Sequence, residues 1–221
     1  MKYLLHIDTS TDTSILAIGC QGKLIASSIN EESRNHAGTI NNIINKLLQD
    51  AQISFEQLSA IVVCAGPGSY TGLRIGLATA KGLCYALGKP LILDNKLALL
   101  ALNTLLEHPS YAQYISLLIA REKEYFISIY DQNGICVLSP QHVTENQLND
   151  LIRKKEKSYF ISNVENKVID NLMMGNFHID YDIKTPLKYW ISSAFEKYNS
   201  NQFVNLMEAE PFYLKQVYTH K

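Results

Sequence analysis

Two turns in the first third of this 221-residue sequence carry groups that could bind phosphate. The first turn, residues 8–11, follows a strand-like run and consists of Asp8, Thr9, Ser10 and Thr11. Its hydroxyl and backbone N–H groups could donate hydrogen bonds to a phosphate, while the Asp8 carboxylate could hold a metal ion or a water molecule. The same residues are equally typical of Asx and Ser/Thr turns between hairpin strands, so this turn alone leaves a purely structural role open.

The second turn is a glycine loop, residues 66–69, between an apolar run at 60–65 and a helix expected over 70–88. Its candidate phosphate-site residues are Gly66, Gly68 and Ser69. Glycine permits backbone angles that are closed to other residues, which allows a tight turn between a strand and a helix. Gly88 stands where a glycine commonly ends a helix. In a nucleotide-binding protein, this loop would lie near the phosphates.

The helix expected over residues 70–88 is apolar around most of its circumference, which indicates burial on more than one side. One arc carries large residues suited to a sheet. A second arc carries mostly small residues that let another helix approach closely: Ile75, Thr79, Gly82 and Ala86. We expect this second arc and the neighbouring amphipathic helix 33–51 to form a partner interface. The expected interface residues are His36, Ile40, Arg74, Ile75, Ala78, Thr79, Gly82 and Ala86. The alternative is that the second arc is an internal layer of a large domain.

Composition indicates a globular chain with no general affinity for nucleic acid. Hydrophobic residues make up 47% and charged residues 19%, and the net charge is −1. The basic cluster 153–157 is interpreted as a helix C-terminus rather than an RNA surface. The four cysteines lie in apolar segments without Cys-x-x-Cys spacing, which predicts buried, reduced thiols and a cytoplasmic location: Cys20, Cys64, Cys84 and Cys136. We expect no signal peptide and no transmembrane helix.

Apolar periodicity predicts the same order of elements twice. In the first half, strands are expected at 3–8, 14–20, 23–29, 60–65 and 89–93, with helices at 33–51, 70–88 and 95–107. The second half repeats three strands at 114–120, 125–130 and 134–138, a helix at 144–154 and a strand at 158–162, followed by helices at 165–174 and 186–198. The chain is therefore expected to form an N-terminal lobe, 1–108, and a smaller, degenerate lobe, 109–221.

This order resembles the duplicated β-β-β-α-β-α fold of the actin/hexokinase/Hsp70-like (ribonuclease H-like) α/β proteins, with a shortened second half. The segments 7–11 and 66–76, with His36 between them, resemble the TsaB (YeaZ) family of the bacterial tRNA threonylcarbamoyladenosine apparatus. The resemblance implies a non-catalytic subunit that acts with a TsaD-like transferase and a TsaE-like ATPase on the adenosine next to the tRNA anticodon. It also implies that this subunit needs no cofactor of its own, although ATP and a metal ion act in the complex. The sequence leaves open whether the free protein is a monomer or a homodimer, and contact with tRNA is expected only through the complex.

One helix position supports a non-catalytic role. TsaD-like proteins hold a metal with a His-x-x-x-His pair, whose members share one face of a helix. Here His36 is followed four residues later by Ile40, so this two-histidine site cannot form, and His36 is expected to cap or pack. The family often has an aspartate where this sequence has Ile119, and the role of that carboxylate is open here.

Two other functions were weighed against this interpretation. A stand-alone ATP-dependent kinase or ATPase would use Asp8 to hold a metal or act as a base, but the second half contains only isolated glycines, Gly134 and Gly175. A metallopeptidase would need a histidine pair such as His-Glu-x-x-His, which the sequence lacks.

Overall fold

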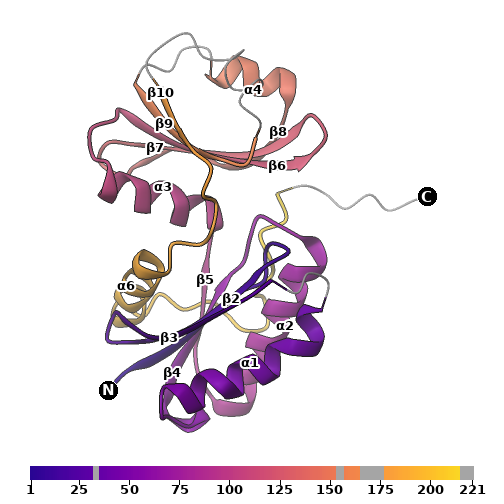
Figure 1. The fold of residues 1–221 in the computed structure, drawn as a ribbon, viewed down its shortest axis with the longest axis vertical. Helices are drawn as coiled ribbons and strands as arrows, with labels where there is room; N and C mark the ends of the chain where they lie inside the picture. The colour runs from indigo at the N-terminus through magenta and orange to yellow at the C-terminus, as the bar shows by residue number, and fades with distance from the viewer. Residues whose placement is uncertain (32–34, 153–156, 165–176, 215–221) are drawn as a thin grey trace, which may run out of the picture. The chain divides into compact units, whose positions relative to one another are not determined.

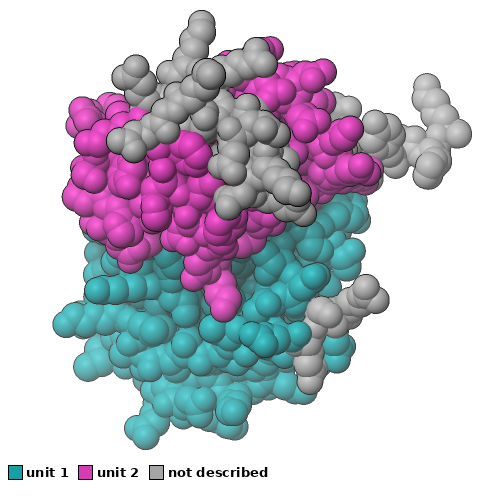
Figure 2. Space-filling view, turned by 45° about the horizontal axis from the view of Figure 1, so that its top comes forward, with its two compact units in different colours: residues 1–96, 185–212 teal, residues 97–184, 213–221 magenta. Residues whose placement is uncertain are grey.

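Two five-stranded sheets with the same strand order form the framework of the chain (Figure 1). The computed structural model describes residues 1–31, 35–152, 157–164 and 177–214. The chain divides into unit 1, residues 1–96 and 185–212, and unit 2, residues 97–184 and 213–221, which Figure 2 colours separately.

The sheet of unit 1 has the order β3-β2-β1-β4-β5. Its strands are β1 (Tyr3–Asp8), β2 (Ser14–Cys20), β3 (Lys23–Asn30), β4 (Leu58–Cys64) and β5 (Leu91–Asp94). Strands β1, β2 and β3 pair antiparallel, whereas β4 and β5 run parallel to β1. The carboxyl ends of β1, β4 and β5 therefore meet at one edge of the sheet, and this edge carries the Asp8 turn and the glycine loop.

Helices cover both faces of this sheet (Figure 1). They are α1 (His36–Asp50), α2 (Tyr70–Leu87) and α6 (Leu187–Asn199), and a short 3-10 helix, η1 (Phe55–Gln57), precedes β4. Leu5 and Ile7 of β1 belong to the core formed with α1 and α2, while His6 between them contacts Trp190 of α6. Because neighbouring residues of a strand point to opposite faces, α6 covers the face opposite to α1 and α2.

Unit 2 has the sheet order β10-β9-β6-β7-β8. Its strands are β6 (Gln113–Arg121), β7 (Glu124–Asp131), β8 (Cys136–Thr144), β9 (Ser158–Ser162) and β10 (Phe177–Asp180), and its helices are α3 (Lys96–Glu107) and α4 (Glu145–Ile152). Leu148 of α4 lies in one apolar cluster with Ile115, and Leu100 of α3 lies in another with Tyr114. Ile115 and Tyr114 are neighbours on β6, so the two helices cover opposite faces.

The two sheets are the same arrangement used twice, because β6–β10 pair in the order and directions of β1–β5. Among the described residues, the helix after each fifth strand departs from a simple tandem repeat. Helix α3 follows β5 but packs in unit 2, and α6 follows β10 but packs in unit 1. The observed units therefore differ from the expected division after residue 108, since residues 185–212 return to the first sheet.

Most expected elements are present, with two corrections. Cys136 is exposed because it begins β8, an edge strand, whereas the other three cysteines are buried as predicted. Strand β10 was not predicted. The expected helix 165–174 and most of the basic cluster, 153–156, lie outside the described residues. None of the described helices is both long and apolar enough to cross a membrane.

Candidate functional site

The carboxylate of Asp8 lies at the end of β1 and is almost completely buried. The backbone N–H of Ser10 donates to its Oδ1 at 2.8 Å, and the hydroxyl of Thr185 donates to its Oδ2. The ammonium of Lys96 lies 3.4 Å from the same Oδ2 and also donates to the Ser10 hydroxyl at 3.2 Å. Burial alone would raise the pKa of this carboxyl, but the Lys96 charge and the hydrogen bonds from Ser10 and Thr185 hold the pKa below its usual value.

Lys96 reaches Asp8 from the junction between β5 and α3, and the glycine loop fixes its backbone. The Lys96 N–H donates to the carbonyl of Gly66 at 2.8 Å, and the Ala65 N–H donates to the carbonyl of Asp94 at 2.8 Å. These bonds join the ends of β4 and β5, so the backbone that carries the Lys96 side chain is held in place. Lys96 was not predicted as a site residue, although a lysine in the first turn of an apolar helix opposes the helix dipole and could have signalled a buried partner.

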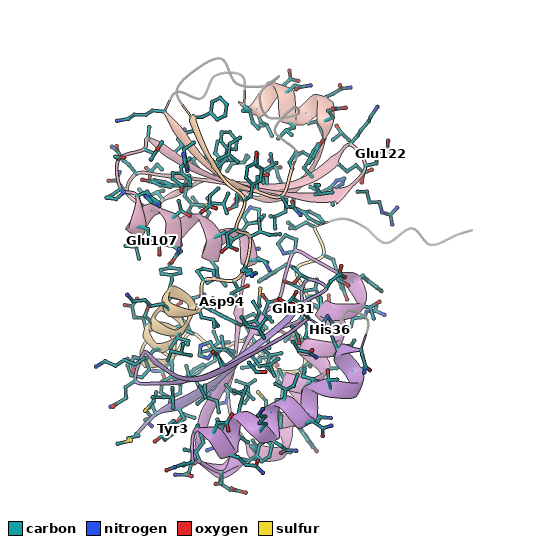
Figure 3. All side chains as sticks on the ribbon, viewed as in Figure 1. Tyr3, Glu31, His36, Asp94, Glu107 and Glu122 are labelled. Atoms are coloured by element: carbon teal, nitrogen blue, oxygen red, sulfur yellow. The ribbon has the colours of Figure 1, made fainter. Side chains whose placement is uncertain are left out.

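A second buried carboxylate, Asp94 at the end of β5, is labelled in Figure 3 and holds α6 against the sheet of unit 1. The indole N–H of Trp190 donates to Asp94 Oδ2 at 2.8 Å, and the ammonium of Lys197 donates to Oδ1. Together with the Thr185–Asp8 bond, these contacts attach the returning segment 185–199 to two strand ends. Thr185 and Asp94 were also not predicted as site residues, because each is far in the sequence from the residues that it contacts.

The glycine loop and the start of α2 pack directly against the Asp8 turn. The Ser69 N–H donates to the Ser10 carbonyl at 2.7 Å, and the Thr9 hydroxyl donates to the Gly72 carbonyl at 2.7 Å. A Cβ atom on Gly68 would clash with the backbone carbonyl of Ser10, and one on Gly72 with that of Thr9. The structure thus brings the two predicted turns together, but here the glycines make room for the chain's own backbone.

Two expected interface residues of α1 are buried within unit 1 instead of exposed. The side chain of His36 is 6% exposed, and its Nε2 lies 2.9 Å from the carbonyl oxygen of Thr11. A carbonyl oxygen only accepts, so Nε2 carries the proton and ties α1 to the Asp8 turn, which confirms a packing role for His36. Ile40 is buried in the core with Leu5. Neither side chain is therefore part of an exposed face of this chain.

The small-residue arc of α2 is largely exposed. Within this arc Gly82 and Ala86 are exposed and Ile75 and Thr79 are half-buried, and the neighbouring Ala78 is also exposed. No atom of the described residues, outside the neighbouring part of the helix, lies within 4 Å of the position that a Cβ on Gly82 would take. This arc is therefore not an internal layer of unit 1, and its role as an interface stays a prediction.

Two more exposed residues lie on the same helix. Arg74 is exposed, and its guanidinium carbon Cζ lies over the ring of Tyr70, 4.2 Å from the ring centroid. Tyr85 is 84% exposed and was not among the expected interface residues.

In unit 2, Ile119 is 45% exposed on β6, and its N–H donates to Oδ1 of Asn163 at 2.8 Å. An isoleucine side chain offers no ligand atom, so this position cannot perform carboxylate chemistry. Among the residues that the structure describes, no group of three or more His, Cys, Asp or Glu side chains is placed to hold a metal ion.

Comparison with protein families and curated proteins gives two kinds of match. A family model described as "TsaD: tRNA N6-adenosine threonylcarbamoyltransferase" matches residues 23–171, more than half of the chain. The chain is 39% identical over 100 residues to the tRNA threonylcarbamoyladenosine biosynthesis protein TsaB of Bacillus subtilis, covering 45% of this chain and 44% of that protein. It is 34% identical over 107 residues to the tRNA N6-adenosine threonylcarbamoyltransferase of Clostridium perfringens, covering 41% and 32%. The chain thus spans less than half the length of these curated relatives.

Solved structures show the fold. YeaZ from Pseudomonas aeruginosa aligns with a TM-score of 0.78 at 23% identity, over 97% of this chain and 100% of that chain. The activator of 2-hydroxyisocaproyl-CoA dehydratase from Clostridium difficile, solved with bound ADPNP, aligns with a TM-score of 0.52 at 11% identity, over 91% and 96%. These likenesses and the repeated strand order confirm the duplicated α/β fold of the actin-like ATPases.

Proposed function

The chain belongs to the family described as TsaD: tRNA N6-adenosine threonylcarbamoyltransferase, and within it to the TsaB (YeaZ) proteins, and we propose that it is a non-catalytic partner subunit. The reaction it supports is threonylcarbamoylation of the adenosine next to the tRNA anticodon. Its partners are a TsaD-like transferase and a TsaE-like ATPase, and it also pairs with a second copy of itself. This role in tRNA modification supports a cytoplasmic location for the subunit.

The state of the Asp8 turn is the observation that carries this proposal. Both oxygens of Asp8 already accept hydrogen bonds from Ser10, Thr185 and Lys96, and all four side chains are buried. A buried carboxylate that is already neutralised by an ammonium and hydrogen-bonded through both oxygens is poorly suited to hold a metal–nucleotide complex or to take a proton from a substrate. The subunit therefore needs no cofactor of its own, while ATP and a metal ion act elsewhere in the complex.

The exposed arc of α2 supports the partner role. Small side chains at Ala78, Gly82 and Ala86 allow a helix of another subunit to approach closely. The net charge of −1 provides few phosphate contacts, so tRNA is bound through the partner subunits rather than by this chain alone.

Reconstitution tests the proposal. The TsaD-like and TsaE-like proteins of the same organism are incubated with unmodified tRNA, ATP and the threonylcarbamoyl precursors, with and without this chain, and the modified nucleoside is quantified by mass spectrometry. We expect modification only when the chain is present, and no ATP hydrolysis by the chain alone. The alternative, a stand-alone ATP-dependent kinase or ATPase, requires ATP turnover by the purified chain that Asp8→Ala abolishes.

A further inference from the structure

The fold of this chain implies a nucleotide-bound metal ion at the end of β1, but the residues present do not fit one. Mg²⁺ requires close to octahedral coordination by oxygen ligands. Here the atom beside Asp8 Oδ2 is the ammonium nitrogen of Lys96, which has no lone pair to offer a metal. A metal ion in the same place would also be repelled by that positive charge at short range.

We propose that Lys96 is a built-in cation, which replaces a divalent metal ion at Asp8, and that removing its ammonium converts the Asp8 turn into a binding site for a divalent cation. This inference concerns the chain's own residues and does not depend on the proposed function.

Charge balance is the first argument. The side chains of Asp8 and Lys96 are only 1% and 2% exposed, so water does not solvate either charge. A buried carboxylate is stable only when a nearby positive charge and hydrogen bonds compensate it. Among the described residues, Lys96 is the only positively charged side chain that lies within ion-pair distance of Asp8.

The oxygen atoms around the ammonium are the second argument. Lys96 donates to Asp8 Oδ2 and to the hydroxyl of Ser10, and Thr185 adds a second hydroxyl at Asp8. Without the ammonium, the Asp8 carboxylate and the Ser10 hydroxyl remain at the vacated position, with the Thr185 hydroxyl bound to the same carboxylate. Such oxygen atoms are the ligands that hard divalent cations prefer. The backbone bond from Lys96 to Gly66 belongs to the loop and does not depend on the lysine side chain.

The experiment compares Mn²⁺ binding by three full-length proteins: the wild type, Lys96→Ala, and Lys96→Ala combined with Asp8→Asn. Binding is measured by calorimetry and by electron paramagnetic resonance of free Mn²⁺. The unfolding midpoint is measured with and without Mn²⁺ through the fluorescence of Trp190, the only tryptophan, which lies in unit 1. The double variant is the matched control, because it has the same vacated volume but no carboxylate charge.

We expect Lys96→Ala to bind one Mn²⁺ with a Kd on the order of 10⁻⁴–10⁻³ M, as weak oxygen sites do, and to unfold at a higher temperature when Mn²⁺ is present. The wild type and the double variant should bind at least roughly tenfold more weakly, equivalent to about 1.4 kcal/mol. If Lys96→Ala folds only when Mn²⁺ is added, that result also supports the proposal.

Three outcomes would overturn it. The first is a wild type that binds Mn²⁺ tightly and loses this binding in Asp8→Asn, because the lysine would then not exclude the metal. The second is a folded Lys96→Ala that responds to Mn²⁺ no more than the double variant does. The third is a Lys96→Ala that stays unfolded with Mn²⁺ while the double variant folds, because a divalent cation would then fail to replace the ammonium.

Discussion

The ammonium nitrogen of Lys96 lies 3.4 Å from Oδ2 of Asp8, and this ion pair is almost completely removed from water. Breaking such a pair from one side leaves an uncompensated buried charge. We therefore expect Lys96→Met or Asp8→Asn alone to lower the free energy of unfolding of unit 1 by about 3–5 kcal/mol. Urea unfolding followed by Trp190 fluorescence measures this loss.

The double variant is the control for this prediction. With both charges removed, Asp8→Asn/Lys96→Met should be more stable than either single variant, because neither neutral side chain demands a counter-charge. Purely additive losses would show that the two side chains do not stabilise each other.

Two glycines of α2 should respond in opposite ways to the same substitution. Gly72→Ala places a methyl group against the backbone carbonyl of Thr9, which cannot move away easily, so unfolding becomes easier by about 1–3 kcal/mol. Gly82→Ala meets no described atom outside its own stretch of helix, and should stabilise the free chain by about 0.5–1 kcal/mol through better helix propensity. Denaturant unfolding of both variants distinguishes close packing from conformational freedom, and equal effects would contradict this explanation.

The buried His6 should make unit 1 sensitive to mild acid. Burial lowers the pKa of His6 to about 4, although hydrogen bonds to the backbone of Leu4 and Ala17 act in the opposite direction. As pH falls from 6.5 to about 4, the unfolded chain takes up the proton and the folded chain does not. The free energy of unfolding should therefore be fully retained above pH 6.5 and fall by on the order of 3 kcal/mol towards pH 4.

A substitution that cannot be protonated tests this assignment. His6→Asn keeps an N–H near the carbonyl of Leu4 but does not titrate. The free energy of unfolding of this variant should therefore depend much less on pH between 6.5 and about 4. His178→Asn, at an exposed histidine of unit 2, is the matched control. It should leave unchanged the pH dependence of the free energy of unfolding measured by Trp190 fluorescence. The opposite pattern would assign the acid sensitivity to another group.

The exposed arc of α2 is tested by a long charged side chain. Because Ala86 is exposed in the free chain, Ala86→Arg should fold normally, since arginine costs only a few tenths of a kcal/mol in a helix. Against a closely packed partner helix the same side chain clashes and buries a charge, so affinity for the TsaD-like subunit should fall at least about 100-fold.

Calorimetric titration with the partner measures this loss. Ala112→Arg, the same change at an exposed position in unit 2, should bind like the wild type. Normal binding by Ala86→Arg would remove this arc from the interface.

The sequence predicted the framework well where apolar runs are bounded by turn residues. Strands β1, β2 and β9 have the predicted bounds, and the repeated order of elements led to the correct fold class. Strand β10 escaped prediction because it has only four residues, too few for its alternation of apolar and polar side chains to stand out. The exposure of Cys136 depends on which strand lies at the sheet edge, and that property belongs to the assembled sheet rather than to the local sequence.

The candidate site could be predicted only in part, because local patterns do not identify distant partners. The Asp8 turn and the glycine loop were both recognised, and the structure brings them together. However, Lys96 is 88 residues from Asp8 in the sequence and Thr185 is 177 residues away. Apolar periodicity and turn residues carry no information about such distant pairs. The sequence alone therefore could not show whether the polar groups of the Asp8 turn are free to bind phosphate or already bound to other residues of the chain.

The crossing of α3 and α6 between the two units also fixes the order in which a nascent chain can mature. Domains usually fold in the order in which they leave the ribosome, N-terminal first. Unit 1 cannot do so, because α6 and Thr185 are translated after every strand of both sheets. While unit 2 is being synthesised, the face of the first sheet that carries His6 lacks α6, and Asp8 lacks its hydrogen bond from Thr185. Unit 1, which starts the chain, therefore receives α6 only after every strand of unit 2 has been made, and a stop codon anywhere before residue 185 would leave unit 1 without this helix.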